Sequence, residues 1–226
     1  SFPTRRSSDL HFDMSPETAE KALDLVFRSP SPSIKIEFQG GEPLLNFELL
    51  KFIVIGAEAR NKTAVKNLAF VIATNLAVLT DEVLDFCRAH KIHISTSLDG
   101  PADLHNHNRP RPGHDSYQRA ISGIQRVRDA LGRDQVSAVM TTTGASLGRV
   151  REIVDEYVSQ GFRGIFLRPL SPYGFAVKTK WVAAYDADKW LDFYLNGLDY
   201  IIELNKRGLP FKEFYASTVL TKMLTP

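Results

Sequence analysis

Two adjacent glycines, Gly40 and Gly41, follow the apolar segment "IKIEF" and precede an acid, Glu42, and a proline. Glycine tolerates a positive φ and allows a ligand to come close to the backbone, because it has no side chain. Glu42 could hold a cation or an amine beside these glycines, or it could be an ordinary carboxylate in the first turn of a helix. The glycine pair alone is more typical of a tight turn, so its interpretation depends on its neighbours.

Polar residues also follow the other apolar segments. Asn75 and Ser97 each end such a segment and could hydrogen-bond a sugar hydroxyl, although each alone is more often a strand-end cap. Arg109 lies in the loop beyond Ser97, where its guanidinium could form a bidentate pair with a carboxylate, although "NRPRP" also fits a solvated loop. Later segments end in "TTT" and in "RPL", which closes with Leu170. Ligands of parallel α/β proteins bind at the carboxyl ends of strands, so we expect one converging site.

The elements that position these residues alternate between strands and helices. The predicted strands begin near Ile34, Ala69, Ile92, Gln135 and Arg163, with amphipathic segments between them. This spacing predicts right-handed βαβ units and a parallel sheet. A helix starting near Ser15 precedes the first strand and lacks a strand of its own. We therefore expect an α/β fold, a partial (β/α)6 TIM-like barrel of parallel strands truncated at both ends.

The composition excludes several classes of protein. The chain has 226 residues, 43% hydrophobic and 24% charged, with a net charge of +2, which argues against binding to nucleic acid or an anionic membrane. No apolar run is long enough to span a membrane and no secretion signal is present, so we expect a cytoplasmic protein. The single cysteine, Cys87, excludes an internal disulfide and a site with several cysteines.

The first ten residues, "SFPTRRSSDL", match no helix or strand pattern. They are the in-frame translation of TCT TTC CCT ACA CGA CGC TCT TCC GAT CT, a common sequencing-adapter DNA. We interpret residues 1–10 as adapter sequence, with a natural disordered tail as the alternative. The organisation expected is then a core domain over residues 11–175 and a helical segment over residues 176–226.

Three further clusters allow a functional and a structural interpretation. Cys87, His90 and His93 have a spacing compatible with zinc, but they lie across a helix end and a strand, so Cys87 is expected to be a buried packing residue. The histidines of the loop beyond Ser97 are expected to be solvated and to contact substrate rather than bind metal; they are His105, His107 and His114. An aromatic group could bind a peptide or pack against a following domain; it comprises Tyr173, Phe175, Trp181 and Tyr185.

Taken together, "FQGGEPLL", "ATN" and "STSLDGP" with "HNRPR" beyond it resemble the radical S-adenosylmethionine (radical SAM) enzymes. The resemblance runs from about His11 to about Pro172. It is closest to the peptide-modifying branch that includes the anaerobic sulfatase maturases and carries a C-terminal auxiliary iron–sulfur (SPASM-type) domain. The wording of "TSLDGP", "MTTT" and "FLRPLSPYGFA" also resembles the maturases of His-Xaa-Ser peptide systems.

The resemblance implies roles for the candidate residues. Gly40, Gly41 and Glu42 would contact the methionine amino group of S-adenosylmethionine (SAM). Ser97 would contact the ribose of SAM, Arg109 its methionine carboxylate and Leu170 its adenine. Asn75 would lie at the same strand ends as part of this binding site. The resemblance also implies reductive cleavage of SAM by a 4Fe–4S cluster, and a 5′-deoxyadenosyl radical that takes a hydrogen atom from a precursor peptide or protein. An electron donor such as flavodoxin or ferredoxin is the other implied partner.

The chain departs from the family in one respect. The family holds its cluster with a Cys-x3-Cys-x2-Cys loop after the first strand, and no such loop occurs here. We expect these cysteines just upstream of His11 in the parent protein, which makes this fragment inactive and leaves the catalytic residues unknown. Two alternatives remain. One is a catalytically dead, peptide-binding family member. The other is a conventional TIM-like barrel enzyme, which has less support because the sequence shows neither a phosphate cradle nor a paired catalytic acid and base.

Overall fold

The computed structural model describes residues 13–169 and 186–225. The chain divides into two compact units. The first comprises Ser1–Thr96 and Arg119–Ser137, and the second comprises Ser97–Gln118 and Ala138–Pro226. Residues 1–10, Leu170 and the aromatic group from Tyr173 to Tyr185 lie outside the described residues.

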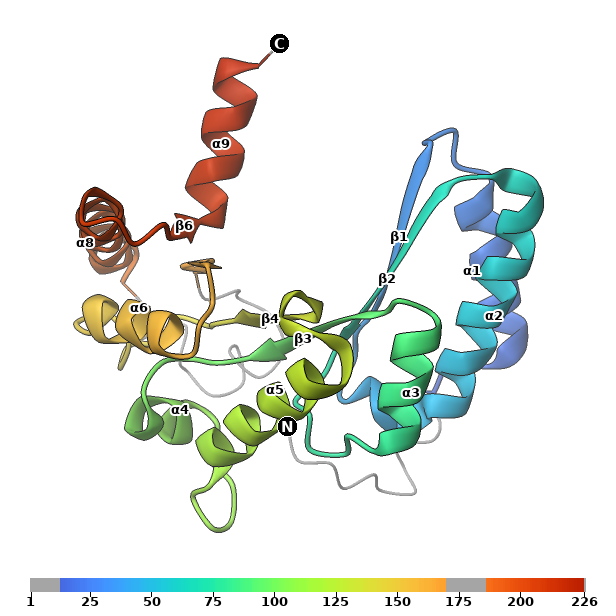
Figure 1. The fold of residues 1–226 in the computed structure, drawn as a ribbon, viewed down its shortest axis with the longest axis horizontal. Helices are drawn as coiled ribbons and strands as arrows, with labels where there is room; N and C mark the ends of the chain where they lie inside the picture. The colour runs from blue at the N-terminus through green and yellow to red at the C-terminus, as the bar shows by residue number, and fades with distance from the viewer. Residues whose placement is uncertain (1–12, 170–185, 226) are drawn as a thin grey trace. The chain divides into compact units, whose positions relative to one another are not determined.

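The first unit carries most of the sheet and the helices that cover it (Figure 1). Its elements are α1 (Pro16–Phe27), β1 (Ser33–Phe38), the 3-10 turn η2 (Pro43–Asn46), α2 (Phe47–Ala64), β2 (Asn67–Ala73), α3 (Asp81–Ala89), β3 (His93–Ser97), α5 (Ser116–Leu131), η3 (Arg133–Gln135) and β4 (Val136–Val139). The ends of β3, α5 and β4 extend across the boundary between the units. Ser15 caps α1 with its side chain and Pro16 is the first helical residue, as the sequence predicts.

The four strands form one sheet in the order β1-β2-β3-β4. β2 runs parallel to both β1 and β3, and the register aligns Glu37 with Val71 and Val71 with His93. Successive residues of a strand point to opposite faces, so this alignment fixes which side chains share a face. One face is the apolar core, with Ile34, Phe70, Ile72 and Ile94 buried on it. Helices α1 and α2 lie along that side of β1 and β2 (Figure 1).

The other face of β1 is polar. Glu37 forms an ion pair with Lys35 and accepts a hydrogen bond from Gln39 at 2.6 Å, so three alternating side chains form one ladder. In line with it, on β3, His93 contacts the Ser137 hydroxyl through Nε2 at 2.9 Å, and burial lowers the pKa of His93. The closed barrels of this architecture are filled with apolar side chains. A polar inner face instead suits a partial barrel that admits solvent or a ligand.

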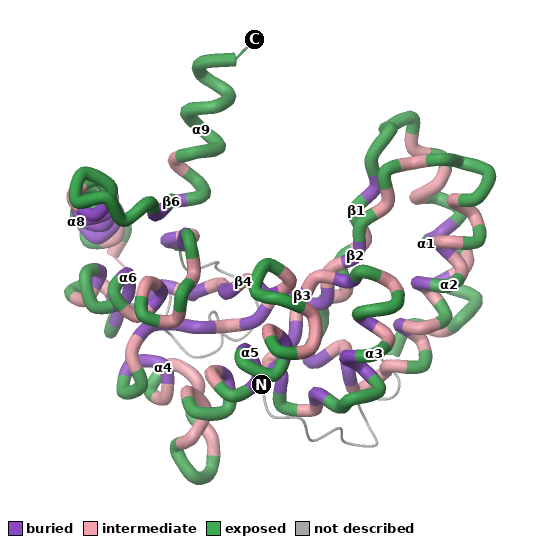
Figure 2. The backbone as a smooth tube through the Cα atoms, in the orientation of Figure 1, coloured by how far each residue is buried: buried purple, intermediate pink, exposed green. Residues whose placement is uncertain are grey.

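In its described residues, the second unit contains a short parallel pair of strands and four helices. Its elements are α4 (Ala102–Asn108), α6 (Val150–Ser159), β5 (Gly164–Ile165), α8 (Ala187–Lys206), β6 (Lys212–Glu213) and α9 (Phe214–Leu224). The core between α6, α8 and β5 includes the fully buried Tyr157, Phe193 and Leu167. Gly197 is needed there, since a Cβ would lie 2.6 Å from a Leu167 methyl carbon. The outer helix α9 is exposed along its length (Figure 2).

The structure confirms the positions of the five predicted strands along the chain and places β1 to β4 in one sheet, whereas β5 pairs with β6 in a second one. It also corrects two details. Residues 102–108, predicted as part of a long loop, form α4, whose buried Leu104 and His105 give it an inner side. The segment after residue 176, predicted to be helical, also contains β6, which is too short to show a strand period. Among the described residues, no helix combines the length and the apolar character required to cross a membrane.

Candidate functional site

The turn after β1 leaves open space beside its backbone. Gly40 has φ +152°, a conformation that side-chain-bearing residues rarely adopt, so glycine is required there by the backbone itself. Gly41 has no such requirement, and a Cβ added at either glycine would meet no atom of residues 13–169 and 186–225 within 4 Å. Protein packing therefore does not explain the second glycine. The space beside the turn is compatible with the close approach of a ligand.

Glu42, at the end of this turn, is buried and hydrogen-bonded. The residue is only 8% exposed, and its carboxylate accepts three hydrogen bonds. Oε1 accepts from the Thr74 hydroxyl at 2.6 Å and from the Leu44 N–H at 3.2 Å, and Oε2 accepts from the Asn75 N–H at 2.9 Å. The carboxylate thus caps η2 and ties the turn after β1 to the end of β2.

The charge of Glu42 has no cationic partner among the described residues. A buried carboxylate is costly unless it is paired with a cation or fully hydrogen-bonded. An ionised carboxylate offers about four acceptor positions, of which three are used here. Glu42 is therefore suited to accept one further bond from a cationic group, which agrees with the predicted contact to an ammonium group.

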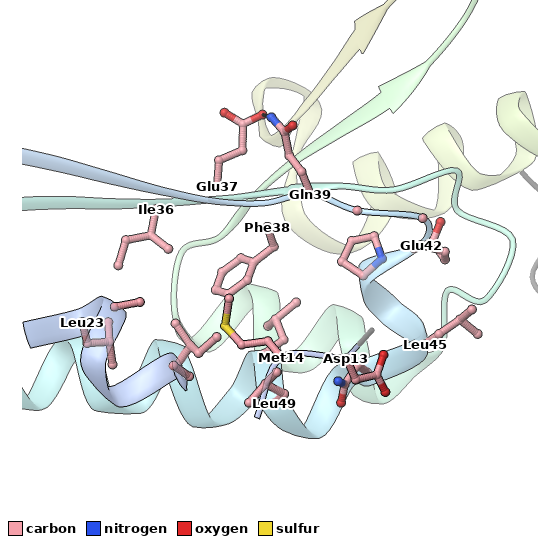
Figure 3. A pocket seen from close by; sticks show the side chains of 18 of the residues that line it. Asp13, Met14, Leu23, Ile36, Glu37, Phe38, Gln39, Glu42, Leu45 and Leu49 are labelled. Carbon is pink, nitrogen blue, oxygen red and sulfur yellow. Dashed lines mark hydrogen bonds between the residues drawn. The ribbon is translucent and has the colours of Figure 1, made fainter. Parts of the chain in front are cut away.

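A cavity of about 650 Å³ adjoins the turn in the first unit (Figure 3). Gly40, Gly41 and Glu42 line one end, while apolar side chains of α1, β1 and α2 line the remainder. Ile36 and Phe38 point toward the helices, and Glu37 and Gln39 point away from them (Figure 3). The turn therefore lies where the apolar side of β1 gives way to polar groups.

Asn75 lies at the end of β2, next to this turn. Its backbone N–H binds Glu42, and its side-chain oxygen accepts a hydrogen bond from the Ala77 N–H at 2.8 Å. The side chain thus acts as the strand-end cap that the sequence allowed as the alternative. The structure brings Asn75 together with Gly40, Gly41 and Glu42 within the first unit.

Ser97 and Arg109 belong to the second unit, and Arg109 is held there by Asp99. Arg109 forms a bidentate pair with Asp99, with Nε at 2.7 Å from Oδ2 and Nη2 at 3.1 Å from Oδ1. Asp99 is 1% exposed and also accepts from the Thr141 N–H at 3.0 Å. Arg109 therefore pairs with a carboxylate of the chain itself in this structure. Its contact with the methionine carboxylate stays a prediction, as do those of Ser97 and of Leu170.

His105 differs from its predicted role. It is 2% exposed, and its Nδ1 accepts a hydrogen bond from the Asp99 N–H at 3.2 Å, so the expectation of a solvated side chain is wrong for this residue. Burial lowers its pKa to about 4, with the positive charge of Arg109 adding to the effect and Asp99 opposing it. His105 is thus a neutral acceptor that holds the turn after β3. His107 and His114 are exposed, as expected.

Two buried polar residues were not among the predicted site residues. Thr74 precedes Asn75, and only its position beside a "GGE" turn could have suggested a partner for Glu42. Glu213, 3% exposed at the end of β6, accepts from the Leu167 N–H, the Tyr194 hydroxyl and the Ala216 N–H. Because β6 has only two residues, it shows no strand pattern in the sequence, and nothing in the sequence indicated a role for Glu213.

No group of three or more potential metal ligands is found in residues 13–169 and 186–225. Cys87 is 1% exposed, and burial raises the pKa of its thiol to about 12, so the predicted packing role is confirmed. A cluster ligand must be a thiolate. The described residues therefore do not fit an iron–sulfur cluster, while the turn at Gly40–Glu42 fits a ligand with an ammonium group.

The chain belongs to the radical SAM superfamily, whose family model matches residues 1–157. It is 24% identical over 198 residues to a cysteine-type anaerobic sulfatase-maturating enzyme of Clostridium perfringens, covering 81% of this chain and 52% of that protein. The chain spans about half the length of the curated relatives it matches. For two further relatives, the match covers 58% and 54% of their length.

Solved structures share the fold. The structure of anSMEcpe with bound AdoMet and Cp18Cys peptide matches with a TM-score of 0.80 at 18% identity, over 94% of this chain and 59% of that one. SuiB of Streptococcus suis bound to precursor peptide SuiA matches with a TM-score of 0.61 at 17% identity, over 88% and 42% of the two chains. The chain therefore has the radical SAM α/β fold with its parallel strands.

Proposed function

We propose that this chain is the SAM-binding part of a peptide-modifying radical SAM maturase. The observation that carries the proposal is the turn at Gly40–Glu42. It combines open space beside two glycines with a buried carboxylate that lacks a cation among the described residues. These features suit the amino end of SAM. Support for the ligand comes from the family and from anSMEcpe, whose structure contains AdoMet.

A peptide or protein is the proposed substrate. Structural neighbours are bound to peptides, and the curated relatives include anaerobic sulfatase-maturating enzymes. The polar face of β1, with Lys35, Glu37 and Gln39, is compatible with a peptide backbone that needs hydrogen-bonding partners. The proposal includes a cytoplasmic location, an electron donor of the flavodoxin or ferredoxin type and a following SPASM-type domain.

The cluster belongs to the parent protein in this proposal. When bound, a 4Fe–4S cluster would supply the electron that cleaves SAM. The cysteines that hold it are proposed to precede His11, since Cys87 is buried and its thiol is held protonated. The contribution of this chain is then to bind SAM at Gly40–Glu42 and to place its amino end.

The test begins with the genomic DNA upstream of His11. We expect a Cys-x3-Cys-x2-Cys motif in frame, in place of the adapter-like codons. The extended protein, purified without oxygen, should bind iron and should form 5′-deoxyadenosine from SAM and a chemical reductant. An intact upstream frame without cysteines would favour the catalytically dead, peptide-binding member, and an extended protein without iron or 5′-deoxyadenosine would refute the proposed chemistry.

A further inference from the structure

The orientation of the Glu42 carboxylate depends on one hydroxyl group. Thr74 donates to Glu42 Oε1 at 2.6 Å, the shortest of the three bonds to this carboxylate. The same hydroxyl oxygen accepts a hydrogen bond from the Leu76 N–H at 3.1 Å. Because this acceptor bond fixes the direction of its proton, the hydroxyl acts as an oriented donor rather than a free rotor.

Counting acceptor positions shows what this bond achieves. Each carboxylate oxygen accepts about two hydrogen bonds. Oε1 is filled by Thr74 and Leu44, while Oε2 holds only the Asn75 N–H. The remaining acceptor position is therefore on Oε2. Without the Thr74 hydroxyl, both oxygens would have a free position and the carboxylate could rotate between them.

We infer that Thr74 is a positioning residue, which orients Glu42 so that Oε2 offers a single acceptor position to the ammonium group of the ligand. The inference rests on the proposed function and adds to it a residue that never touches the ligand. Fixed orientation matters because a charge-assisted hydrogen bond in a buried site depends on alignment. Removing the hydroxyl should weaken recognition of the amino group while leaving the rest of the ligand recognised.

The experiment compares two probes by equilibrium dialysis with the chain as it stands. One is SAM, and the other is desamino-S-adenosylmethionine, in which a hydrogen atom replaces the amino group. Thr74→Val should weaken SAM binding about tenfold, equivalent to about 1.4 kcal/mol, and leave binding of the desamino probe unchanged. Thr74→Ser keeps both hydrogen bonds of the hydroxyl and should restore the wild-type preference for SAM.

Thr96→Val is the matched control. Thr96 is also a buried threonine, but its hydroxyl has no hydrogen-bond partner among the described residues. The same change of side chain therefore removes no bond at this position. Thr96→Val should bind both probes as the wild type does.

Each outcome decides one claim. Equal weakening for both probes in Thr74→Val would mean a general structural role and would overturn the inference, as would an unchanged preference for SAM. If Thr74→Val does not fold, Glu42→Gln is the second variant. It keeps the shape but loses the anionic acceptor, and an unchanged preference for SAM would again overturn the inference. Wild-type protein that binds neither probe would instead refute the proposed function, and the inference with it.

Discussion

Buried carboxylates lie at or just beyond the ends of three strands, and each accepts a hydrogen bond from the backbone just beyond the end of another strand. The pairs are Glu42 with the Asn75 N–H, Asp99 with the Thr141 N–H, and Glu213 with the Leu167 N–H. Backbone groups beyond the last ladder bond need a partner when they are buried. These acids supply such partners and hold the strand ends in place. The three acids differ in their ion pairing. Among the described residues, Asp99 is paired with Arg109, whereas Glu42 and Glu213 form no ion pair.

The two glycines of the turn should respond differently to alanine. Gly40→Ala should cost about 1 kcal/mol of stability or more, because its φ of +152° strains any side-chain-bearing residue. Gly41→Ala should change stability by less than about 0.5 kcal/mol, since its Cβ meets no atom within 4 Å, yet it should weaken SAM binding. Chemical denaturation and dialysis measure the two effects. Unchanged SAM affinity in Gly41→Ala would show that no ligand occupies this space.

His105 should make the protein sensitive to mild acid. Burial holds its pKa near 4 in the folded chain, below its ordinary value of 6.5. Between these values the unfolded chain binds a proton that the folded chain does not, so the free energy of unfolding falls as pH drops from 6.5 to 4, by about 3 kcal/mol in total. His105→Asn can keep an acceptor for the Asp99 N–H and should flatten this part of the profile.

The control is His107→Asn, a change on the same helix at an exposed histidine. It should leave the pH profile of the unfolding free energy as in the wild type. A profile for His105→Asn that still falls between pH 6.5 and 4 would show that another group titrates in this window.

At the scale of elements, α4 is attached to the turn after β3 through two side chains. His105 accepts from the backbone of Asp99, and Arg109, which follows the helix, pairs with the Asp99 carboxylate. A helix of this length is marginal by itself in water, so tertiary bonds must stabilise it. This arrangement explains why a polar, proline-rich sequence that is typical of a loop contains a helix.

Breaking the Asp99–Arg109 pair should destabilise the protein more when Arg109 is replaced than when Asp99 is replaced. Arg109→Met should destabilise the protein by about 3–5 kcal/mol, because it leaves Asp99, 1% exposed, without its cation. Asp99→Asn should cost less, since Arg109 is 31% exposed and water can solvate it. Urea denaturation measures both free energies of unfolding, and equal costs would argue against this view of the pair.

The sequence predicted the strand order well because continuous apolar segments such as "LAFVIAT" leave little choice. It also placed Gly40, Gly41, Glu42 and Asn75 at adjacent strand ends, which the structure confirms. It could not predict that Arg109 pairs with Asp99, because hydrogen-bond partners depend on side-chain geometry. His105 was misjudged for the same reason, since a histidine in a polar stretch carries no sign of burial.

At the scale of the whole molecule, the candidate site residues lie in two units. Gly40, Gly41, Glu42 and Asn75 belong to the first, while Ser97 and Arg109 belong to the second. The family and the fold are shown by the comparisons, whereas the chemistry requires a cluster that the described residues do not fit. We therefore expect SAM binding by this chain to be measurable without SAM cleavage.

The chain should hold no iron–sulfur cluster after anaerobic incubation with iron and sulfide. Its single thiol, Cys87, is buried and has a pKa raised to about 12, so it is neither accessible nor ionised at neutral pH. Iron analysis and visible absorption after gel filtration measure the outcome. Stoichiometric iron and sulfide in the wild-type chain, lost in Cys87→Ala, would contradict the assignment of Cys87 to packing.

The most direct test of the central claim is an NMR titration of the isotope-labelled chain with SAM. We predict that the amide signals of Gly40, Gly41 and Asn75 shift together with a common dissociation constant, and that the desamino probe shifts them less. Absence of any shift at these amides up to saturating SAM, or shifts confined to other parts of the chain, would contradict the assignment of this turn to the ligand.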